Sequence, residues 1–209
     1  MFITFEGPDG SGKTAQLKPL IADLKSLDLP ILATREPGGT SIGDQIRATL
    51  LDLENTAMVD RTEALLYQAA RAQLVDEVIK PHLSRGGIVI SDRYADSTLA
   101  YQGYGHQNSL SALKEIIDYA TGGLTPDCTV LLDLDPEVGL ERRIHGGNFN
   151  RLDAYDLDFH RRVRAGYLAL VEENPRRWEV VDAQQTFEEV QEEIRRIIFL
   201  QLESAGFLR

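Results

Sequence analysis

A strand-like run near the N-terminus, residues 2–6, leads directly into a glycine-rich loop that is followed by helix-forming residues. The loop reads Gly7-Pro8-Asp9-Gly10-Ser11-Gly12-Lys13-Thr14 and matches the phosphate-binding pattern G-x-x-x-x-G-K-[ST]. Its glycines let successive backbone N–H groups surround an anion, and the helix that begins near Gly12 adds its dipole. In such a loop Lys13 contacts the β- and γ-phosphates, and the Thr14 hydroxyl ligates Mg²⁺. The chain is therefore predicted to bind a nucleoside triphosphate together with Mg²⁺.

Strand-like and helix-like segments alternate along the 209 residues, which is the pattern of a parallel sheet with helices on both faces. The apolar runs predict strands at about 2–6, 30–34, 87–92, 128–134 and 178–182. Helices are predicted at about 13–27, 41–52, 60–84, 109–121, 136–145, 156–173 and 186–204. Because the sequence has a single phosphate-binding loop, we expect one α/β domain that spans residues 1–209.

Residues 146–155 are polar and glycine-rich, with arginines on both sides. Beside a phosphate-binding loop we interpret this segment as a lid, since phosphoryl transfer has to exclude water; an ordinary surface loop is the alternative. Arg142 and Arg143 precede the segment, and Arg151 lies within it. Solvated side chains explain most of these arginines, but one or two near the phosphates would offset the charge that develops during transfer.

The formal net charge of −11 disfavours sequence-independent binding to DNA or RNA, which needs a cationic surface. The single cysteine, Cys128, excludes an internal disulfide and a four-cysteine zinc site, and its apolar neighbours predict a buried side chain. The sequence has neither a signal peptide nor an apolar run of about eighteen residues. We therefore expect a soluble, cytoplasmic protein that acts on small molecules, with no nucleic-acid or membrane partner.

An acid and a base, Asp92 and Arg93, follow the apolar run 88–91. A carboxylate at the end of a buried strand suits Mg²⁺ held through its water shell; Asp133 or Asp135, after another apolar run, competes for this role. Arg93 suits an anionic substrate group, because a guanidinium binds phosphate with two parallel hydrogen bonds. A structural ion pair between Asp92 and Arg93 is the alternative.

The helix-like segment 60–84 carries Glu63, Tyr67 and Arg71 at four-residue intervals, hence on one face. An aromatic ring and an arginine so placed suit a flat ligand ring, but the spacing alone favours an exposed helix face with a Glu–Arg pair. Further along the chain, Gln102 has the paired donor and acceptor that reading the edge of a base requires.

Taken together, these segments resemble the bacterial thymidylate kinase family over essentially the whole chain. The phosphate-binding loop, Arg35-Glu36-Pro37-Gly38-Gly39, Asp92-Arg93-Tyr94 and Ala100-Tyr101-Gln102-Gly103 occur in the family's order and at its spacing. The resemblance implies a doubly wound P-loop kinase fold with five parallel strands in the order 2-3-1-4-5, and a homodimer. It also implies ATP-dependent phosphorylation of dTMP to dTDP.

The resemblance also assigns residues to the two sets of phosphates. Gly7 to Thr14 match the ATP-binding loop, in which Asp9 is the acid expected near the sugar and phosphate of the substrate. Arg47 and Arg93 match positions that hold the dTMP phosphate, and Glu36 matches a position near the substrate. Arg142 matches an arginine that packs on adenine.

For the nucleoside part of dTMP, the resemblance assigns five positions. Tyr67 lies where the family usually has a phenylalanine stacked on thymine, so a hydroxyl is added here. Arg71 matches the residue that contacts thymine O4, and Thr98 and Gln102 match the base-contacting pair. Tyr101 matches the tyrosine placed against the 2′ position of the sugar.

The sequence departs from the family in the expected lid. Relatives without an arginine in the phosphate-binding loop carry a catalytic arginine in the lid, often followed by Asp-Arg; here Gly146 takes the place of that arginine, and Asn150 replaces the Asp. Arg151 is therefore our first candidate for the arginine that stabilises the transferring phosphoryl group, and Arg143 the second. The predicted catalytic residues are Lys13, Asp9, Arg93, Arg151 and Arg143.

Two other functions stay open. A deoxynucleoside kinase needs a carboxylate that takes the proton of a sugar hydroxyl, and Asp9 or Glu36 is a candidate for that base. A P-loop switch that binds nucleotide in order to recruit partners is the alternative from another class, although the Asn/Thr-Lys-x-Asp guanine signature does not occur.

Overall fold

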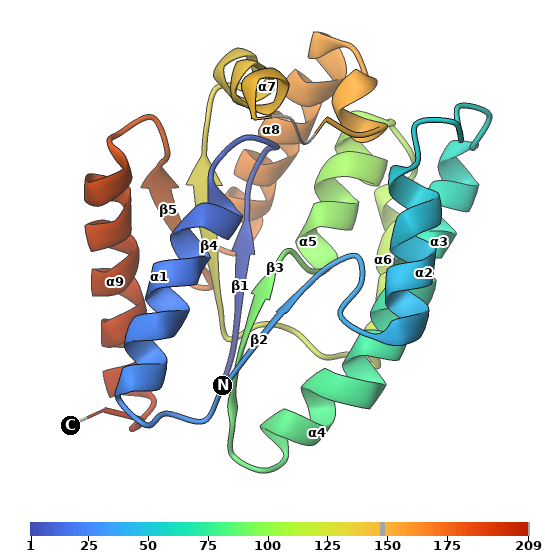
Figure 1. The fold of residues 1–209 in the computed structure, drawn as a ribbon. Coiled ribbons are helices and arrows are strands. Elements are labelled where there is room, and N and C mark those ends of the chain that lie inside the picture. Colours follow the sequence, from blue (N-terminus) through green and yellow to red (C-terminus); the bar gives the residue numbers. More distant parts are fainter. Residues whose placement is uncertain (147–148, 209) are drawn as a thin grey trace.

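The computed structural model describes residues 1–146 and 149–208. In these residues five parallel strands form a sheet in the order β2-β3-β1-β4-β5, with β1 at its centre (Figure 1). The strands are β1 (Phe2–Glu6), β2 (Ile31–Arg35), β3 (Ile88–Asp92), β4 (Cys128–Asp133) and β5 (Trp178–Asp182). The predicted fold class and strand order are confirmed, and each predicted strand matches an observed one to within about one residue at either end.

Helices surround the sheet on both faces (Figure 1). They are α1 (Lys13–Ser26), α2 (Ser41–Leu51), α3 (Asp60–Leu74), α4 (Lys80–Leu83), α5 (Ala95–Thr98), α6 (Leu110–Thr121), α7 (Pro136–His145), α8 (Leu157–Glu173) and α9 (Phe187–Ser204). Two π-helical segments, η1 (Val75–Ile79) and η2 (Leu99–Gly105), continue α3 and α5, and a 3₁₀ turn, η3 (Leu152–Ala154), precedes α8.

The central strands are buried on both faces, because side chains alternate along a strand and helices cover each side. Ile3 and Phe5 of β1 pack with Val130 of β4 in the cluster that α1 and α9 cover. On the other face, Leu131 of β4 packs in a cluster with residues of η2 and α8. Cys128 is buried in the first cluster, as its apolar neighbours predicted.

The observed helices differ from the predicted ones mainly in two places. The segment 60–84, predicted as one helix, contains the π-helical turns of η1 between α3 and α4. Residues 95–105, for which the sequence predicted no element, form α5 and η2. Since η2 carries Tyr101 and Gln102, this unpredicted helix positions part of the site. Among the described helices, none has the length and apolar character needed to cross a membrane.

Candidate active site

A large cleft opens at the carboxyl edge of the sheet, where open α/β sheets bind their ligands. Its volume of about 1620 Å³ exceeds the roughly 300–1,000 Å³ of a typical small-molecule pocket, so it has room for two ligands. The predicted site residues that line it are Asp9, Gly10, Gly12, Lys13, Thr14, Glu36, Arg47, Tyr67, Asp92, Arg93, Thr98, Tyr101, Gln102, Arg142 and Arg143. The remaining predicted residues, which lie outside this lining, are Gly7, Pro8, Ser11, Arg71 and Arg151.

The phosphate-binding loop packs directly against the backbone of α7. A Cβ atom on Gly10, where φ is +78°, would lie 2.1 Å from the carbonyl oxygen of Gly139. A Cβ on Gly139 would in turn lie 2.4 Å from the carbonyl oxygen of Asp9. Only glycine fits at either position without moving the backbone, so this contact holds the loop in place between β1 and α7.

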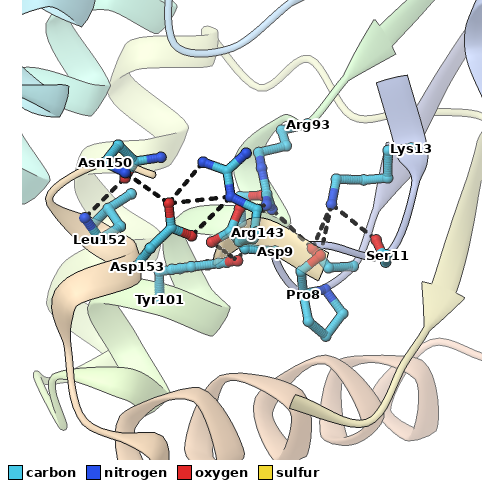
Figure 2. A network of polar contacts seen from close by, with 12 residues as sticks. Pro8, Asp9, Ser11, Lys13, Arg93, Tyr101, Arg143, Asn150, Leu152 and Asp153 are labelled. Atoms are coloured by element: carbon cyan, nitrogen blue, oxygen red, sulfur yellow. Dashed lines mark hydrogen bonds and ion pairs between the residues drawn. The ribbon is translucent and has the colours of Figure 1, made fainter. Parts of the chain in front are cut away.

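Lys13, at the start of α1, is held by the loop itself (Figure 2). Its Nζ donates to the carbonyl oxygens of Gly7 and Pro8, both at 2.9 Å, and to Ser11 Oγ at 3.1 Å. Burial and the neighbouring Arg93 lower the pKa of Lys13 to about 8, against the opposing effect of nearby carboxylates. The ammonium group therefore lies inside the loop that the sequence assigns to the triphosphate.

Thr14 and Asp92 meet at the side of the cleft, where the Thr14 hydroxyl donates to Asp92 Oδ2 at 2.6 Å. A hydroxyl and a carboxylate oxygen are the hard donors that Mg²⁺ prefers, so this pair fits the predicted metal role. The competing carboxylates have other partners: both oxygens of Asp133 accept from Arg164 at 2.8 Å, and Asp135 caps α7. No group of three or more His, Cys, Asp or Glu side chains among the described residues is arranged to hold a metal by itself.

Asp9, Arg93 and Tyr101 form a closed cluster beside the loop (Figure 2). Arg93 Nη2 lies 2.8 Å from Asp9 Oδ1, and the Tyr101 hydroxyl donates to Asp9 Oδ2 at 2.7 Å and accepts from Arg93 at 3.1 Å. Burial alone would raise the pKa of Asp9, but Arg93 and Lys13 outweigh it and lower this pKa to about 2. Arg93 has a φ of +72°, a strained value for a residue with a side chain, which is characteristic of functional sites. The ion pair of Arg93 is thus with Asp9, and Asp92 contacts Thr14 instead.

Glu6, a buried carboxylate that was not predicted as a site residue, is linked to Arg93 of this cluster through Ser97 and Tyr167. Its Oε2 accepts from the hydroxyls of Ser97 at 2.5 Å and Tyr167 at 2.9 Å, and both of these oxygens accept from Arg93. Burial, followed by the charge of Asp96, raises the pKa of Glu6 to about 7. The sequence does contain a signal for Glu6, because this residue ends a buried strand directly before Gly7 of the phosphate-binding loop.

Tyr67, Thr98 and Gln102 line the end of the cleft that the resemblance assigns to the base. Burial, followed by the charge of Glu63, raises the pKa of Tyr67, so its hydroxyl stays protonated. Within the described chain that hydroxyl has no hydrogen-bond partner. Gln102 donates from Nε2 to Glu63 Oε1 at 2.8 Å.

Arg71, predicted to contact the base, is instead buried behind the cleft with 1% of its surface exposed. Its Nη2 lies 2.6 Å from Glu36 Oε2 and 2.9 Å from the carbonyl oxygen of Tyr94. Its Nη1 donates to Gln68 Oε1 at 2.7 Å and Thr98 Oγ1 at 3.0 Å. The charge of Glu36 raises the pKa of Arg71 in spite of burial. Glu36 Oε1 is buried and has no partner in the part of the chain described.

The arginines near the expected lid point in different directions. Arg142 donates to the carbonyl oxygen of Ala183 at 3.2 and 3.3 Å, and to that of Gly10 in the phosphate-binding loop at 3.4 Å. Arg143 lines the cleft and pairs with Asp153 at 2.7 Å, with Asp9 and Arg93 close enough to affect its pKa (Figure 2).

Arg151 is buried and turned away from the cleft. Its guanidinium lies 2.5 Å from Glu63 Oε2 and also donates to the Leu50 carbonyl oxygen and the Tyr155 hydroxyl, both at 2.9 Å. The structure therefore does not place the first candidate for the catalytic arginine at the phosphates, because Glu63 holds it. The expected lid, residues 146–155, includes positions 147 and 148, which lie outside the described residues.

Comparison with known proteins gives one consistent family. The sequence model of the family Thymidylate kinase matches residues 5–194. A thymidylate kinase of Roseiflexus castenholzii is 52% identical over 211 residues, covering 95% of this chain and 92% of its own length. One from Deinococcus radiodurans is 50% identical over 194 residues, covering 93% and 94%. The crystal structure of thymidylate kinase from Ehrlichia chaffeensis superimposes with a TM-score of 0.78 at 31% identity, covering 95% of this chain and 98% of that one.

Proposed function

The chain belongs to the thymidylate kinase family, and we propose that it transfers the γ-phosphoryl group of ATP to dTMP in the cleft described above, giving dTDP and ADP. The observation that carries this proposal is the placement of Arg93 beside the phosphate-binding loop, paired with Asp9 and backed by Ser97 and Tyr167. A guanidinium in this position suits the phosphate of the acceptor nucleotide, next to the triphosphate of the donor.

The reaction requires positioning and charge neutralisation rather than a base. Because the accepting phosphate of dTMP is already anionic, no side chain has to remove a proton from it. A nucleoside kinase would need such a base, and the two candidates are poorly suited to it. The pKa of Asp9 lies near 2, and Glu36 is paired with Arg71 at 2.6 Å. These pairings favour a monophosphate acceptor over a nucleoside.

For ATP, the proposal assigns the phosphates to the loop from Gly7 to Thr14, with Lys13 contacting the β- and γ-phosphates. Arg142 lies beside this loop, where its planar guanidinium suits the face of adenine. Thr14 and Asp92 would hold Mg²⁺ directly or through its water shell. When bound, the ion supplies positive charge to the phosphate oxygens.

For dTMP, the proposal assigns the phosphate to Arg47 and Arg93 and the sugar to Asp9 and Tyr101, with Glu36 nearby. The base lies against Tyr67, with Thr98 and Gln102 at its edge. Arg71 acts behind these residues and makes no contact with the base. This differs from the contact with thymine O4 that the resemblance implied, because acceptors of the protein occupy all three nitrogens of Arg71.

Arg143 takes the place of Arg151 as the proposed transition-state arginine. Arg143 lines the cleft near Asp9, whereas Arg151 is bound to Glu63 behind it. We further propose that residues 1–209 act as one domain with a lid at about 146–155. We also propose that the protein forms a homodimer and acts in the cytoplasm.

An assay that couples ADP release to an optical signal tests the function, with Mg²⁺, ATP and a panel of monophosphates. We expect dTMP to be the best acceptor, dUMP weaker and AMP negligible, since losing the thymine methyl costs only about 1–3 kcal/mol in an apolar pocket. Thymidine, tested in parallel, is expected to be inert. Equal kcat/KM for dTMP and AMP would contradict the substrate, and preference for thymidine would establish a nucleoside kinase.

A further inference from the structure

Glu6 ends the central strand β1, beside Arg93, the residue that follows β3. Because β1 and β3 are parallel neighbours, with Phe5 in register with Asp92, their carboxyl ends lie at the same edge of the sheet. The backbone N–H of Arg93 donates to the carbonyl oxygen of Phe5 at 2.9 Å, which extends this register to Arg93. Glu6 is fully buried and lies outside the lining of the cleft. Any effect of Glu6 on the site therefore has to act through neighbouring residues.

The carboxylate of Glu6 reaches Arg93 by two routes, one from each oxygen. Oε1 accepts from the backbone N–H of Tyr94 at 2.7 Å, which fixes the peptide unit directly after Arg93. Arg93 has a φ of +72°, and a strained backbone of this kind persists only where its surroundings determine it. Oε2 accepts from the hydroxyls of Ser97 and Tyr167 at 2.5 and 2.9 Å. The same two hydroxyl oxygens accept from Arg93 Nη1 at 3.1 and 3.0 Å.

The charge of Glu6 determines the direction of these hydrogen bonds. An ionised carboxylate only accepts, so both hydroxyl protons are directed toward Glu6 and the lone pairs of Ser97 and Tyr167 are left for Arg93. The carbonyl oxygen of Gly7 is a third acceptor for Arg93 Nη1, at 3.0 Å. Glu6 thus fixes both the backbone and the Nη1 group of Arg93.

This arrangement leaves one edge of the Arg93 guanidinium for a ligand. Within the described residues its Nε has no acceptor, and its Nη2 donates to Asp9 at 2.8 Å and to Tyr101 at 3.1 Å (Figure 2). Nε and Nη2 carry the two parallel N–H groups that bind a phosphate side-on. We propose that Glu6 is a positioning residue, which holds Arg93 so that this edge meets the phosphate of the acceptor nucleotide. The proposal rests on the proposed function, which assigns that phosphate to Arg93.

The surroundings of Glu6 require an acceptor at both ends of its side chain. A glutamine of the same shape has one acceptor and one donor. If the oxygen of that glutamine faced the two hydroxyls, its NH₂ group would meet the N–H of Tyr94. If the amide were turned round, its NH₂ group would meet the hydroxyls of Ser97 and Tyr167, and a hydroxyl proton would have to turn toward Arg93. Glu6→Gln therefore disturbs Arg93 in either orientation, with almost no change in volume.

The ionisation of Glu6 is balanced between opposing neighbours. The charged and titratable groups that face it are Lys13, Arg71, Arg93, Asp96, Tyr167 and Arg177. Burial, followed by the charge of Asp96, raises the pKa of Glu6 to about 7, while Arg93 acts in the opposite direction. Glu6 is therefore ionised above pH 7 and becomes protonated as the pH falls through that value. A protonated Glu6 lacks the second acceptor just as glutamine does, so the effect of the substitution should fade in acid.

The test measures the binding of dTMP and of thymidine by calorimetry at pH 8. The two ligands share the base and the sugar and differ in the phosphate. In Glu6→Gln the ratio of the thymidine dissociation constant to the dTMP dissociation constant is expected to fall at least about tenfold, through weaker binding of dTMP. Damage that is only structural would weaken the binding of both ligands and leave the ratio unchanged.

The same measurement at pH 5.5 adds a second readout. Wild-type Glu6 is then protonated, so the substitution should change the ratio by less than about threefold. Ionisation of the phosphate of dTMP itself affects both proteins alike and cancels in the comparison. A tenfold effect that persists at pH 5.5 would contradict the role of the ionised carboxylate.

Glu189→Gln is the matched control, because Glu189 also accepts from a backbone N–H and a hydroxyl, both of Thr186, but at the exposed start of α9. It removes the same charge and should keep the wild-type ratio. If circular dichroism shows that Glu6→Gln does not fold, Tyr167→Phe carries the test. That variant removes one of the two hydroxyls between Glu6 and Arg93, so the ratio at pH 8 should fall at least about threefold.

An unchanged ratio at pH 8 in the folded variant would overturn the proposal. Failure of the proposed function appears differently, as a wild-type protein that neither binds nor phosphorylates dTMP. In that case crystal structures of the wild type and of Glu6→Gln without ligand still test the positioning of Arg93. We expect Arg93 to lose its positive φ or its contacts with Ser97 and Tyr167 in the variant, and an unmoved Arg93 would overturn the proposal.

Discussion

Positive charge converges on the loop side of the cleft from three elements: Lys13 of α1, Arg93 after β3 and Arg143 of α7. Each of these cations already has acceptors in the protein. Lys13 binds loop carbonyl oxygens, Arg93 binds Asp9, and Arg143 binds Asp153. The cations are therefore held in place before any nucleotide arrives, and an incoming phosphate exchanges one acceptor for another. Such preorganised charge is the main source of catalysis in phosphoryl transfer.

The lowered pKa of Lys13 predicts a pH dependence of ATP capture. Its pKa of about 8 means that the ammonium is charged below pH 8 and is lost as pH rises through that value. Since kcat/KM reports the free enzyme only when neither substrate saturates it, the rate at low ATP and low dTMP is expected to fall about tenfold per pH unit above 8. In Lys13→Arg the charge persists at all accessible pH values, so this alkaline limb should disappear even if activity is lower. A wild-type profile that stays flat to pH 9.5 would contradict the prediction.

The two candidate arginines of the lid region predict different kinetic defects. Arg143→Ala is expected to lower kcat by up to about 10³-fold with little change in the KM values, because a charge on the transferring group matters mainly in the transition state. Arg151→Ala is expected to leave kcat within a few-fold. It should instead lower the free energy of unfolding by about 3–5 kcal/mol, since it leaves Glu63 buried without its counter-charge.

Steady-state kinetics and denaturant unfolding of both variants check this prediction. A large loss of kcat in a stable Arg151→Ala variant would indicate that Arg151, and not Arg143, contacts the phosphates during transfer. Wild-type kcat in Arg143→Ala would mean that Lys13, Arg93 and the metal supply the charge between them.

At the scale of elements, the contact between the phosphate-binding loop and α7 predicts a strict requirement for Gly139. A methyl group there would lie 2.4 Å from the carbonyl oxygen of Asp9, so the loop or the helix has to move. Gly139→Ala is expected to raise the KM for ATP about tenfold or more and to lower the free energy of unfolding by about 1–3 kcal/mol. Alanine favours an isolated helix over glycine, so propensity alone predicts the opposite sign for stability.

Glu141→Ala, at an exposed position of the same helix, is the control and should leave both quantities near the wild-type values. If Gly139→Ala binds ATP normally and is more stable than the wild type, the close contact between Gly139 and Asp9 is not needed for ATP binding or stability.

Elements were predictable from the sequence to the extent that local patterns determine them. The central strands read as apolar runs because helices cover both of their faces, and the helices after residues such as Thr40 and Asp156 begin at side chains that cap them. The π-helical turns of η1 and η2 were not predictable, because an extra residue per turn leaves no clear signal in the spacing. The same limit applies to the site. Helical spacing placed Glu63 and Arg71 on one face, but their roles depend on Gln102, Arg151 and Glu36, which the fold brings to them.

At the scale of the whole molecule, one side of the protein carries exposed apolar side chains that its own helices leave uncovered. Val59 and Leu65 at α3 are 62% and 52% exposed, and Tyr119 of α6 is 91% exposed. Helices α2, α3 and α6 lie together on this side, away from α1 and α9 (Figure 1). Exposed apolar side chains on neighbouring helices favour this side as a protein–protein interface.

The proposed homodimer is therefore expected to form through this side. In Leu65→Glu a charge would be buried without a partner in the dimer, so sedimentation equilibrium should show a shift toward monomer of at least about tenfold in dissociation constant. Because α3 also carries Glu63, Tyr67 and Arg71, loss of the dimer should raise the KM for dTMP more than the KM for ATP.

Leu200→Glu is the matched control, since Leu200 is 51% exposed on α9, on the other side of the sheet. It receives the same charge at the same degree of exposure, and its association should equal that of the wild type. A wild-type protein that sediments as a monomer at micromolar concentration would contradict the homodimer. If both variants weaken the dimer equally, the added charge alone explains the effect, and the result would contradict an interface at α3.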